Sequence, residues 1–188
     1  GAGSSGRLGV LDAAECPPTY STEPKMVQAI IAGGPNAVFK SVEGAEDNAD
    51  AGANAMVTHN VTNSDCVIGI AASGITPFVH GALTQARSFN SVTILVTCSP
   101  SNRVETIADI MIAPLVGPEV ITGSTRMKAG TATKMILNMI STATMIHLGK
   151  TMGNLMVDLQ PTNSKLLNRA IRILQIVLDV TSSQAEQA

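Results

Sequence analysis

Short apolar runs alternate along the chain with stretches of helical periodicity. The runs are apolar at nearly every position, which predicts parallel strands buried on both faces, and they cover residues 26–32, 65–71, 91–97 and 109–115. The other stretches predict helices over 7–15, 36–42, 46–58, 76–88, 125–149 and 162–186. We therefore expect βαβ units in an α/β fold, with a mainly parallel sheet in a three-layer α/β/α arrangement of the flavodoxin-like or Rossmann-like kind.

Glycine and proline residues are expected to mark the ends of these elements. Pro17 and Pro18 are expected to stop the first helix, and Gly149 suits the C′ position after the long helix. A Gly/Ser loop over 1–6 opens the chain, and such a loop normally follows a buried strand. We therefore expect that strand to lie before Gly1, outside this sequence. The last helix carries one apolar stripe, formed by Leu166, Leu167, Ile171, Leu174 and Leu178.

The composition of the chain excludes several classes of function but says little more about the fold. Charged residues make up 14% of the chain, the formal net charge is −2 and the mean hydropathy is +0.25. A nucleic-acid partner is not expected, because such proteins carry a basic stripe, and an apolar content of 45% excludes a disordered chain. The best apolar stretch, 135–149, is interrupted by polar residues and is typical of a core helix, so no membrane partner is expected.

Cysteine and histidine give no sign of a metal site or other cofactor. Cys16, Cys66 and Cys98 are far apart and lack the C-x-x-C spacing, which favours buried thiols in a reducing compartment, the cytoplasm. The histidines are equally dispersed, at His59, His80 and His147. We expect no metal and no cofactor.

The opening GAGSSG at 1–6 matches G-x-G-x-x-G, so a dinucleotide site has to be considered first. That motif needs an acidic residue about 20 positions further on, at the end of the second strand. The next apolar run instead ends in Ala32-Gly33-Gly34, without an acid. The serines suit a compact anion better than a pyrophosphate, so we do not expect a dinucleotide.

Loops rich in hydroxyl groups and glycine precede several predicted helices. The candidate ligand-binding residues are Ser4, Ser5 and Gly6 in the first loop, Ser73, Gly74 and Thr76 in the second, and Ser124 and Lys128 in the third. Each loop alone could be an ordinary helix N-cap. Together, at strand ends and helix starts, they favour a phosphate site, with loops 33–36 and 98–103 on neighbouring strands.

Three glutamates lie beside these loops. Glu15 ends the first predicted helix in an apolar setting before two prolines, and Glu43 and Glu46 are separated by an i, i+3 spacing. Each could be an ordinary solvated or helix-terminal charge. As a set they favour a site with a general acid and a general base, and the residues alone do not assign which glutamate has which role.

The segments that hold these residues resemble one family. They are similar to the N-acetylmuramic acid 6-phosphate etherases in GAGSSGRLGVLDAAECPPTY at 1–20, IAGGPNAVFKSVEGAED at 31–47, GIAASGITPFV at 69–79, VGPEVITGSTRMKAGTATK at 116–134 and GNLMVDLQPTNSKL at 153–166. The resemblance implies a SIS fold, a homodimer and cleavage of the D-lactyl ether at carbon-3 of the sugar phosphate. It implies a SIS sugar-phosphate-binding domain over 1–160 and a C-terminal helical arm over 161–188.

The resemblance also implies roles for the glutamates. Glu15 matches the residue that donates a proton to the departing lactate, Glu46 matches the second catalytic glutamate, expected to be the base, and Glu43 is expected to hold the sugar. The chain departs from the family at Ile75, where an arginine is usual, and this removes one potential contact to the phosphate or the sugar. The change is expected to weaken the affinity for the substrate more than it alters the catalytic reaction.

Two other functions share this fold and remain alternatives. One is a non-catalytic sugar-phosphate sensor like the glucokinase regulatory protein, and the other is a sugar-phosphate isomerase. The segment DAAECPP at 12–18 is typical of the etherases and favours the lyase.

Overall fold

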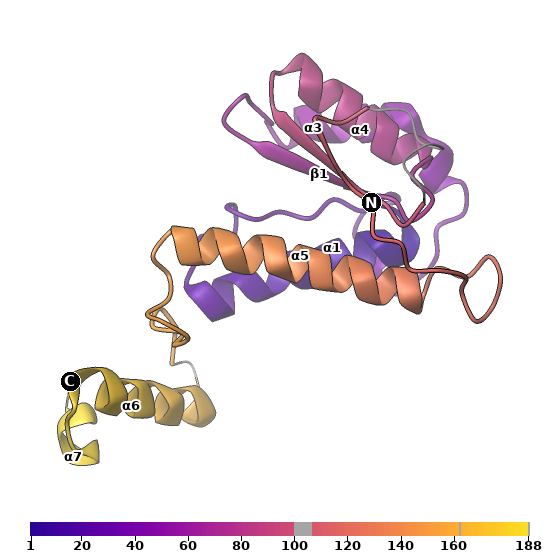
Figure 1. Ribbon diagram of the computed structural model, residues 1–188. Coiled ribbons are helices and arrows are strands. Elements are labelled where there is room, and N and C mark those ends of the chain that lie inside the picture. Colours follow the sequence, from indigo (N-terminus) through magenta and orange to yellow (C-terminus); the bar gives the residue numbers. More distant parts are fainter. Residues whose placement is uncertain (100–106, 162, 188) are drawn as a thin grey trace. The chain divides into compact units, whose positions relative to one another are not determined.

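The computed structural model describes residues 1–99, 107–161 and 163–187 (Figure 1). The chain folds into two compact units. The first unit comprises Gly1–Leu11 and Ala29–Leu137, and the second comprises Asp12–Gln28 and Asn138–Ala188. The predicted domain boundary at 160 is not where this division falls, and it stays a prediction.

The first unit contains a parallel sheet in the order β1-β2-β3. Its strands are β1 (Cys66–Ile70), β2 (Val92–Val96) and β3 (Ile110–Ile112), with Ile70 opposite Val96 and Val96 opposite Ile112. The strands predicted over 65–71 and 91–97 are confirmed, and the third is shorter than predicted. Asp109, directly before β3, accepts hydrogen bonds from the N–H and the hydroxyl of Thr93, both at 2.8 Å.

The strand predicted over 26–32 is wrong. Met26 belongs to a turn in which its N–H donates to Glu23 O at 2.9 Å. Further along, Gly1 N donates to Ile30 O at 3.0 Å and Ala32 N–H donates to Gly1 O at 2.9 Å. Among the described residues this pairing is too short to make a strand, although the apolar run still places Ile31 and Ala32 in buried positions.

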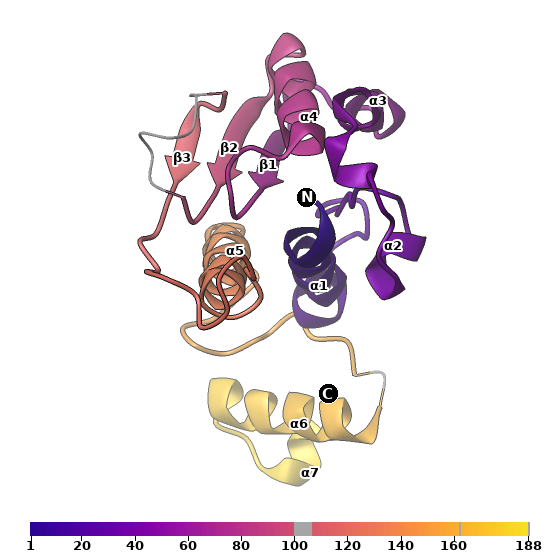
Figure 2. The same ribbon diagram turned by 90° about the vertical axis from the view of Figure 1, so that its right-hand side faces the viewer.

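Helices α3 (Ala49–Thr58) and α4 (Pro77–Ser88) lie on one side of the sheet (Figure 2). The core on this side includes Phe78, Val79, Leu83 and Leu95. Gly69 in β1 lets α4 approach, because an added Cβ would lie 2.7 Å from side-chain carbons of both Val79 and Leu83. The α4 prediction is confirmed, whereas the helix predicted over 46–58 is divided into η1 (Ala45–Asp47) and α3, with Asn48 capping α3 through Ala51 N–H at 2.8 Å.

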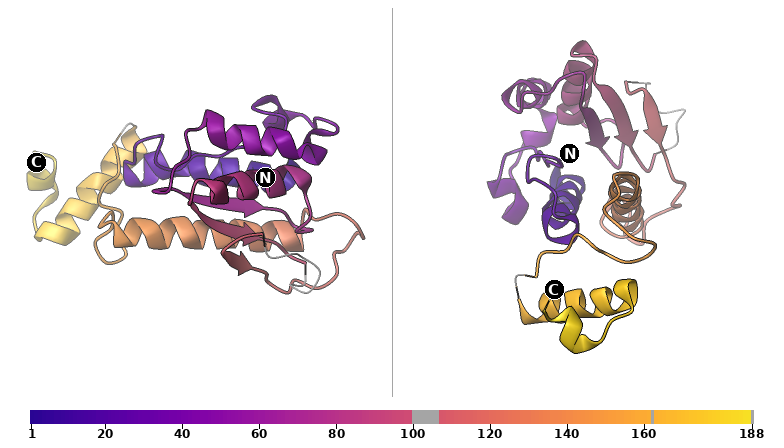
Figure 3. Two further views of the ribbon diagram at one scale, coloured as in Figure 1. Left: turned by 90° about the horizontal axis from the view of Figure 1, so that it is seen from above. Right: turned by 90° about the vertical axis from the view of Figure 1, so that its left-hand side faces the viewer.

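The first turns of α1 (Gly3–Tyr20) and α5 (Lys128–His147) belong to the first unit and lie on the other side of the sheet (Figures 2 and 3). A Cβ on Gly9 would lie 3.2 Å from Ile70 Cδ1, and the Cys98 thiol donates to Ala129 O at 3.8 Å. Helices therefore cover both faces, and the predicted α/β class is confirmed.

Helix α1 corrects two predictions. It begins at Gly3, so residues 3–6 are helical and not part of a loop, and it continues past Pro17 and Pro18 to Tyr20. Neither proline has an N–H to donate to the carbonyl four residues earlier, yet the helix continues for one more turn, and Ser21 N–H donates to Pro17 O at 2.9 Å. The helix predicted over 36–42 is also shorter, as α2 (Asn36–Phe39).

In the second unit, Asp12 joins α1 to α5. Its Oδ1 accepts hydrogen bonds from Asn138 Nδ2 at 2.6 Å and from Ser141 Oγ at 2.9 Å. The end of α5 confirms the prediction for Gly149, which has φ 74°, because Lys150 N–H donates to Met145 O and Gly149 N–H donates to Ile146 O, as in a Schellman motif.

The helix predicted over 162–186 is two helices, α6 (Ser164–Leu178) and α7 (Ser182–Ala185). Asp179 separates them because its backbone is left-handed, with φ 53°. The predicted stripe falls within α6, and residue 162 lies outside the described residues.

We expect Gly52→Ala to destabilise the first unit, because α3 and α4 touch through their backbones at this point. An added Cβ would lie 1.9 Å from Phe78 O. Overpacking of this kind costs about 1–3 kcal/mol, which outweighs the gain in helix propensity. The control is Gly130→Ala, where the nearest atom outside the local helix backbone is Thr125 O at 3.4 Å, and it should stabilise slightly. Urea unfolding measures both, and equal midpoints for the two variants would contradict this packing.

Candidate functional site

The loops that follow β1 and β2 are tied together at the carboxyl edge of the sheet. The carbonyl of Ala72 accepts hydrogen bonds from Cys98 N–H at 3.0 Å, from the Thr97 hydroxyl at 3.2 Å and from the Ser99 hydroxyl at 3.4 Å. Gly1 is also at this edge, since a Cβ built on it would lie 3.0 Å from Ile70 O. The expected meeting of loops at one edge is therefore present, although residues 100–103 of the predicted loop 98–103 lie outside the described residues.

The loop between β1 and α4 carries Ser73, Gly74 and Thr76. Gly74 is left-handed, with φ 78°, and its carbonyl lies 2.7 Å from His80 Nε2. Thr76 is the N-cap residue of α4, but its side chain makes no capping bond, and Ser73 is exposed. Within the described part of the chain the Thr76 hydroxyl has no partner. Ser73 Oγ accepts a hydrogen bond from Ile75 N–H at 3.4 Å, and its own O–H can still donate to a ligand.

The first turn of α1 carries Ser4, Ser5 and Gly6. Ser4 is exposed and Ser5 is partly buried. Gly6 is buried, and a Cβ there would lie 2.6 Å from Ile31 Cγ1 and 2.8 Å from Gly1 O. Close packing accounts for the glycine at this position, while the serines are placed at the start of a long helix, where anions are favoured.

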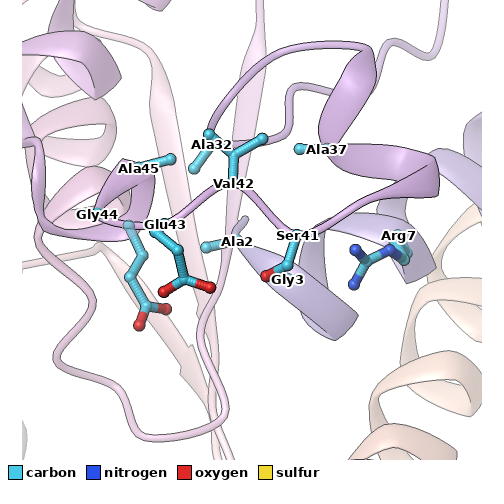
Figure 4. A pocket seen from close by; sticks show the side chains of 11 residues that line it. Ala2, Gly3, Arg7, Ala32, Ala37, Ser41, Val42, Glu43, Gly44 and Ala45 are labelled. Atoms are coloured by element: carbon cyan, nitrogen blue, oxygen red, sulfur yellow. The ribbon is translucent and has the colours of Figure 1, made fainter.

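A cavity of about 120 Å³, here called the acidic cavity, lies beside the start of α1 (Figure 4). Glu43 and Glu46 both line it, as do Ser41 and Arg7. In the segment between α2 and η1, Val42 points towards Ala32 and Ala37, and Glu43 and Ser41 point to the opposite side (Figure 4). This alternation is the normal property of an extended chain, and a turn at Gly44, with φ 70°, then leads into η1 and Glu46.

Arg7 is a functional candidate that the sequence reasoning missed. Its Nε donates to Val38 O at 2.8 Å, which joins α1 to α2 beside the glutamates. A usable signal was present, because Arg7 follows Ser4 by three residues and so shares a helical face with it, but residues 3–6 were expected to be a loop.

Glu15 is exposed on α1, in the part of that helix that belongs to the second unit. It follows Asp12 by three residues, and Asp12 is held by α5 through Asn138 and Ser141. The next residue, Cys16, is buried, and burial, with a smaller contribution from Asp12, raises the pKa of its thiol. Thus the structure brings Glu43 and Glu46 together on one cavity and presents Glu15 on a well-anchored helix.

The start of α5 differs from the expected anion cradle at Ser124 and Lys128. The carboxylate of Glu119 accepts from Lys128 N–H at 3.1 Å and from Ala129 N–H at 3.0 Å. Lys128 Nζ donates to Pro118 O at 2.8 Å, and Ser124 N–H donates to Ile121 O at 3.0 Å. The first-turn donors of α5 are therefore already bound by a carboxylate of the same chain, which the nine-residue separation hid from sequence reasoning.

Across the described ranges, no group of three or more His, Cys, Asp and Glu residues is arranged to hold a metal ion. Over the same ranges, no helix combines the length and the apolar character needed to cross a bilayer.

Two family models match parts of the chain. The N-terminal SIS domain of glucokinase regulatory protein matches residues 1–87, and the C-terminal lid domain of the same protein matches residues 153–188. The SIS match covers the acidic cavity and the loop after β1.

Curated relatives match the chain almost from end to end. N-acetylmuramic acid 6-phosphate etherases from Rhodopirellula baltica and Mesorhizobium japonicum are 52% and 53% identical over 100% of this chain, which corresponds to 62% and 61% of the relatives. The etherase from Clostridium acetobutylicum is 56% identical over 98% of this chain and 61% of its own length. The chain is therefore similar to N-acetylmuramic acid 6-phosphate etherases over almost its whole length. It spans about three fifths of the length of these curated relatives.

This similarity to the etherases confirms the resemblance drawn from the motifs at 1–20 and 116–134. The lid match begins at residue 153, a few residues before the predicted start of the arm at 161. The individual roles of Glu15, Glu43, Glu46 and the loop residues stay predictions.

Proposed function

We propose that the protein is a carbon–oxygen lyase that cleaves the D-lactyl ether of N-acetylmuramic acid 6-phosphate, giving N-acetylglucosamine 6-phosphate and D-lactate. The observation that carries the proposal is the placement of Glu43 and Glu46 on one cavity beside the serines that begin α1. Relatives that are 52–56% identical and bear the etherase name support it. A carboxylate site next to a phosphate site is what this substrate requires.

The chemistry follows from the open-chain form of the sugar. The aldehyde at carbon-1 acidifies the proton on carbon-2, and the lactyl ether on carbon-3 is then a leaving group one carbon further on. A base removes the carbon-2 proton, an acid protonates the ether oxygen as the bond to carbon-3 breaks, and water adds to the unsaturated aldehyde at carbon-3. Two carboxyl groups in different environments can supply both proton transfers.

We assign the base to Glu46, the acid to Glu15 and the holding of the sugar to Glu43. Glu46 lies at the start of η1 on the acidic cavity, directly after the glycine turn that orients the segment. Glu15 is exposed on α1, three residues after Asp12, whose carboxylate accepts a hydrogen bond from Asn138 of α5. Arg7 lines the same cavity as Glu43 and Glu46.

We place the phosphate on the hydroxyl loops at the carboxyl edge of the sheet. Ser4 and Ser5 at the start of α1 are joined there by Ser73, Gly74 and Thr76 before α4. The exposed Ser73 hydroxyl, the Thr76 hydroxyl that makes no capping bond and the N-termini of two helices support this placement. Ser124 and Lys128 are assigned to the rim of the site, because Glu119 already binds the first donors of α5. As in the family resemblance, the protein is proposed to act as a homodimer.

A sugar-phosphate sensor is the second candidate, because both matching family models describe domains of a regulatory protein. Such a sensor would bind the same ligand on the hydroxyl loops without releasing lactate.

Isotope exchange separates the two glutamate roles. In deuterated water, Glu46→Gln should lose both exchange of the carbon-2 proton and lactate release, because no base remains. Glu15→Gln should lose lactate release but keep exchange, since the aldehyde stabilises the carbanion while the ether oxygen stays unprotonated. Each loss should be on the order of 10²–10⁴-fold in rate, the usual contribution of a placed acid or base. Proton NMR of the substrate with the full-length protein measures both.

The reverse pattern would reverse the assigned roles: proton exchange would persist in Glu46→Gln and be lost in Glu15→Gln. Normal lactate release by both variants would refute the mechanism, and binding without any lactate release by the unmodified protein would favour the sensor.

The phosphate placement predicts that Ser73→Ala raises the KM for N-acetylmuramic acid 6-phosphate about 10-fold, because a hydrogen bond to a charged group contributes about 1.5 kcal/mol or more. The matched control is Ser64→Ala, which removes an exposed serine from the turn before β1, at the opposite end of that strand. Steady-state lactate release measures both variants, and equal KM values would contradict the placement.

A further inference from the structure

A second cavity in the first unit, of about 500 Å³, lies between the starts of α1 and α5. We call it the cationic cavity. One face is a helical stripe of α1 with the spacing i, i+3, i+4, i+7, and the other comes from the turn before α5 and from its first turns. Its lining residues are Ser4, Arg7, Leu8, Leu11, Arg126, Gly130, Thr131 and Lys134.

The lining has three cations and no acid. Arg7 uses its Nε on Val38 O, and none of the described residues accepts a hydrogen bond from its terminal nitrogens. Arg126 and Lys134 make no hydrogen bond or ion pair with any of the residues that the structure describes. Cations gathered on one concave surface repel one another and raise the local concentration of anions. Glu119, the acid closest to α5 in the chain, does not line the cavity, because backbone N–H groups hold its carboxylate.

The rest of the lining selects the kind of anion. Leu8 and Leu11 form an apolar wall beside the cations, which suits a small group that has both a methyl and a charge. A phosphate has no apolar part, and the hydroxyl loops already provide for it. A guanidinium group binds a carboxylate with two parallel hydrogen bonds.

Arg7 also relates this cavity to the proposed chemistry. It lines both the acidic cavity and the cationic cavity, so the two are neighbours. In the substrate, the lactyl group is attached at the carbon next to the one that loses its proton, and its carboxylate is only two bonds from the ether oxygen. A carboxylate site next to the base is where that group would lie.

We propose that the cationic cavity binds the carboxylate of the lactyl group, with Arg126 and Lys134 as its cations and Leu8 and Leu11 against its methyl group. This inference rests on the proposed function. It explains how the site could distinguish the substrate from its product sugar, which has the same phosphate but no carboxylate.

Arg126→Met and Lys134→Met test the proposal in the full-length protein. Each should raise the KM for N-acetylmuramic acid 6-phosphate about 10- to 100-fold, the range for one lost charged hydrogen bond. The inhibition constant of N-acetylglucosamine 6-phosphate should stay the same, because that sugar has no lactyl group. Lys25→Met removes an exposed lysine outside the site and is the matched control.

A steric variant tests the cavity without changing its charge. Gly130 lines the cavity, and a Cβ there would meet Thr125 O at an ordinary distance of 3.4 Å, so a longer side chain has room to grow into the space. Gly130→Leu should raise the KM for the substrate by a factor similar to that of Arg126→Met, and Gly130→Ala should do so far less. Circular dichroism before and after the assay shows that the helix is retained.

The outcomes separate this proposal from the proposed function. An unchanged KM in Arg126→Met and Lys134→Met overturns the carboxylate site, and so does equal weakening of substrate and product sugar, which would assign the cavity to the phosphate. If the unmodified protein releases no lactate, the proposed function fails. Saturation-transfer NMR with D-lactate alone then tests the cavity: a signal lost in Arg126→Met supports the site, and no signal with the unmodified protein overturns it.

Discussion

The parallel pairing of β1, β2 and β3 is the constraint on which the rest of the structure depends. Because these strands run in one direction, the chain leaves each of them at the same edge of the sheet. At that edge one carbonyl, that of Ala72, accepts hydrogen bonds from Thr97, Cys98 and Ser99 and joins two successive loops. The first turns of α1 and α5 cover the sheet just below this edge, so hydroxyl groups, carboxylates and cations from distant parts of the sequence gather in the first unit.

In the proposed function, the chemistry of the site is divided by charge between two neighbouring cavities. Glu43 and Glu46 line the smaller one, and Arg126 and Lys134 line the larger one. Arg7 lines both, and its bond to Val38 O joins α1 to α2, the helix before the segment that carries the glutamates. A substrate that must lose a proton from one carbon and an anionic group from the next requires a base and a cation in such proximity. In the proposed function, Arg7 therefore has a structural role and an electrostatic role at once.

The sequence predicted the structure best where a single physical requirement, such as burial or a left-handed backbone, determined the residue type. The continuous apolar runs that became β1 and β2 could be read directly, because burial on both faces permits few polar residues, and Gly149 was predictable because a left-handed C′ position favours glycine. The run at 26–32 is equally apolar, but a strand also needs a partner along its length, and apolarity does not reveal pairing. The opening Gly/Ser stretch was expected to be a loop from its composition, whereas packing of Gly6 against Ile31 makes it the first turn of a helix.

The candidate site shows the same contrast. Glu43 and Glu46 were found because they share a short motif. Arg7 was missed because its relation to the site depends on the helical state of residues 3–6, and Glu119 was missed because its carboxylate reaches across nine residues to cap α5. Contacts of this kind depend on the path of the chain between elements, which propensity and periodicity do not specify.

The central claim, elimination of lactate followed by addition of water, is tested most directly by carrying out the reaction in water enriched in oxygen-18. Elimination and addition predict that the heavy isotope enters the hydroxyl on carbon-3 of N-acetylglucosamine 6-phosphate, seen as an isotope shift of the carbon-3 NMR signal, and that D-lactate keeps its original ether oxygen in the mass spectrum. Label in the hydroxyl of lactate with none at carbon-3 would show cleavage on the other side of the ether and contradict the proposed reaction.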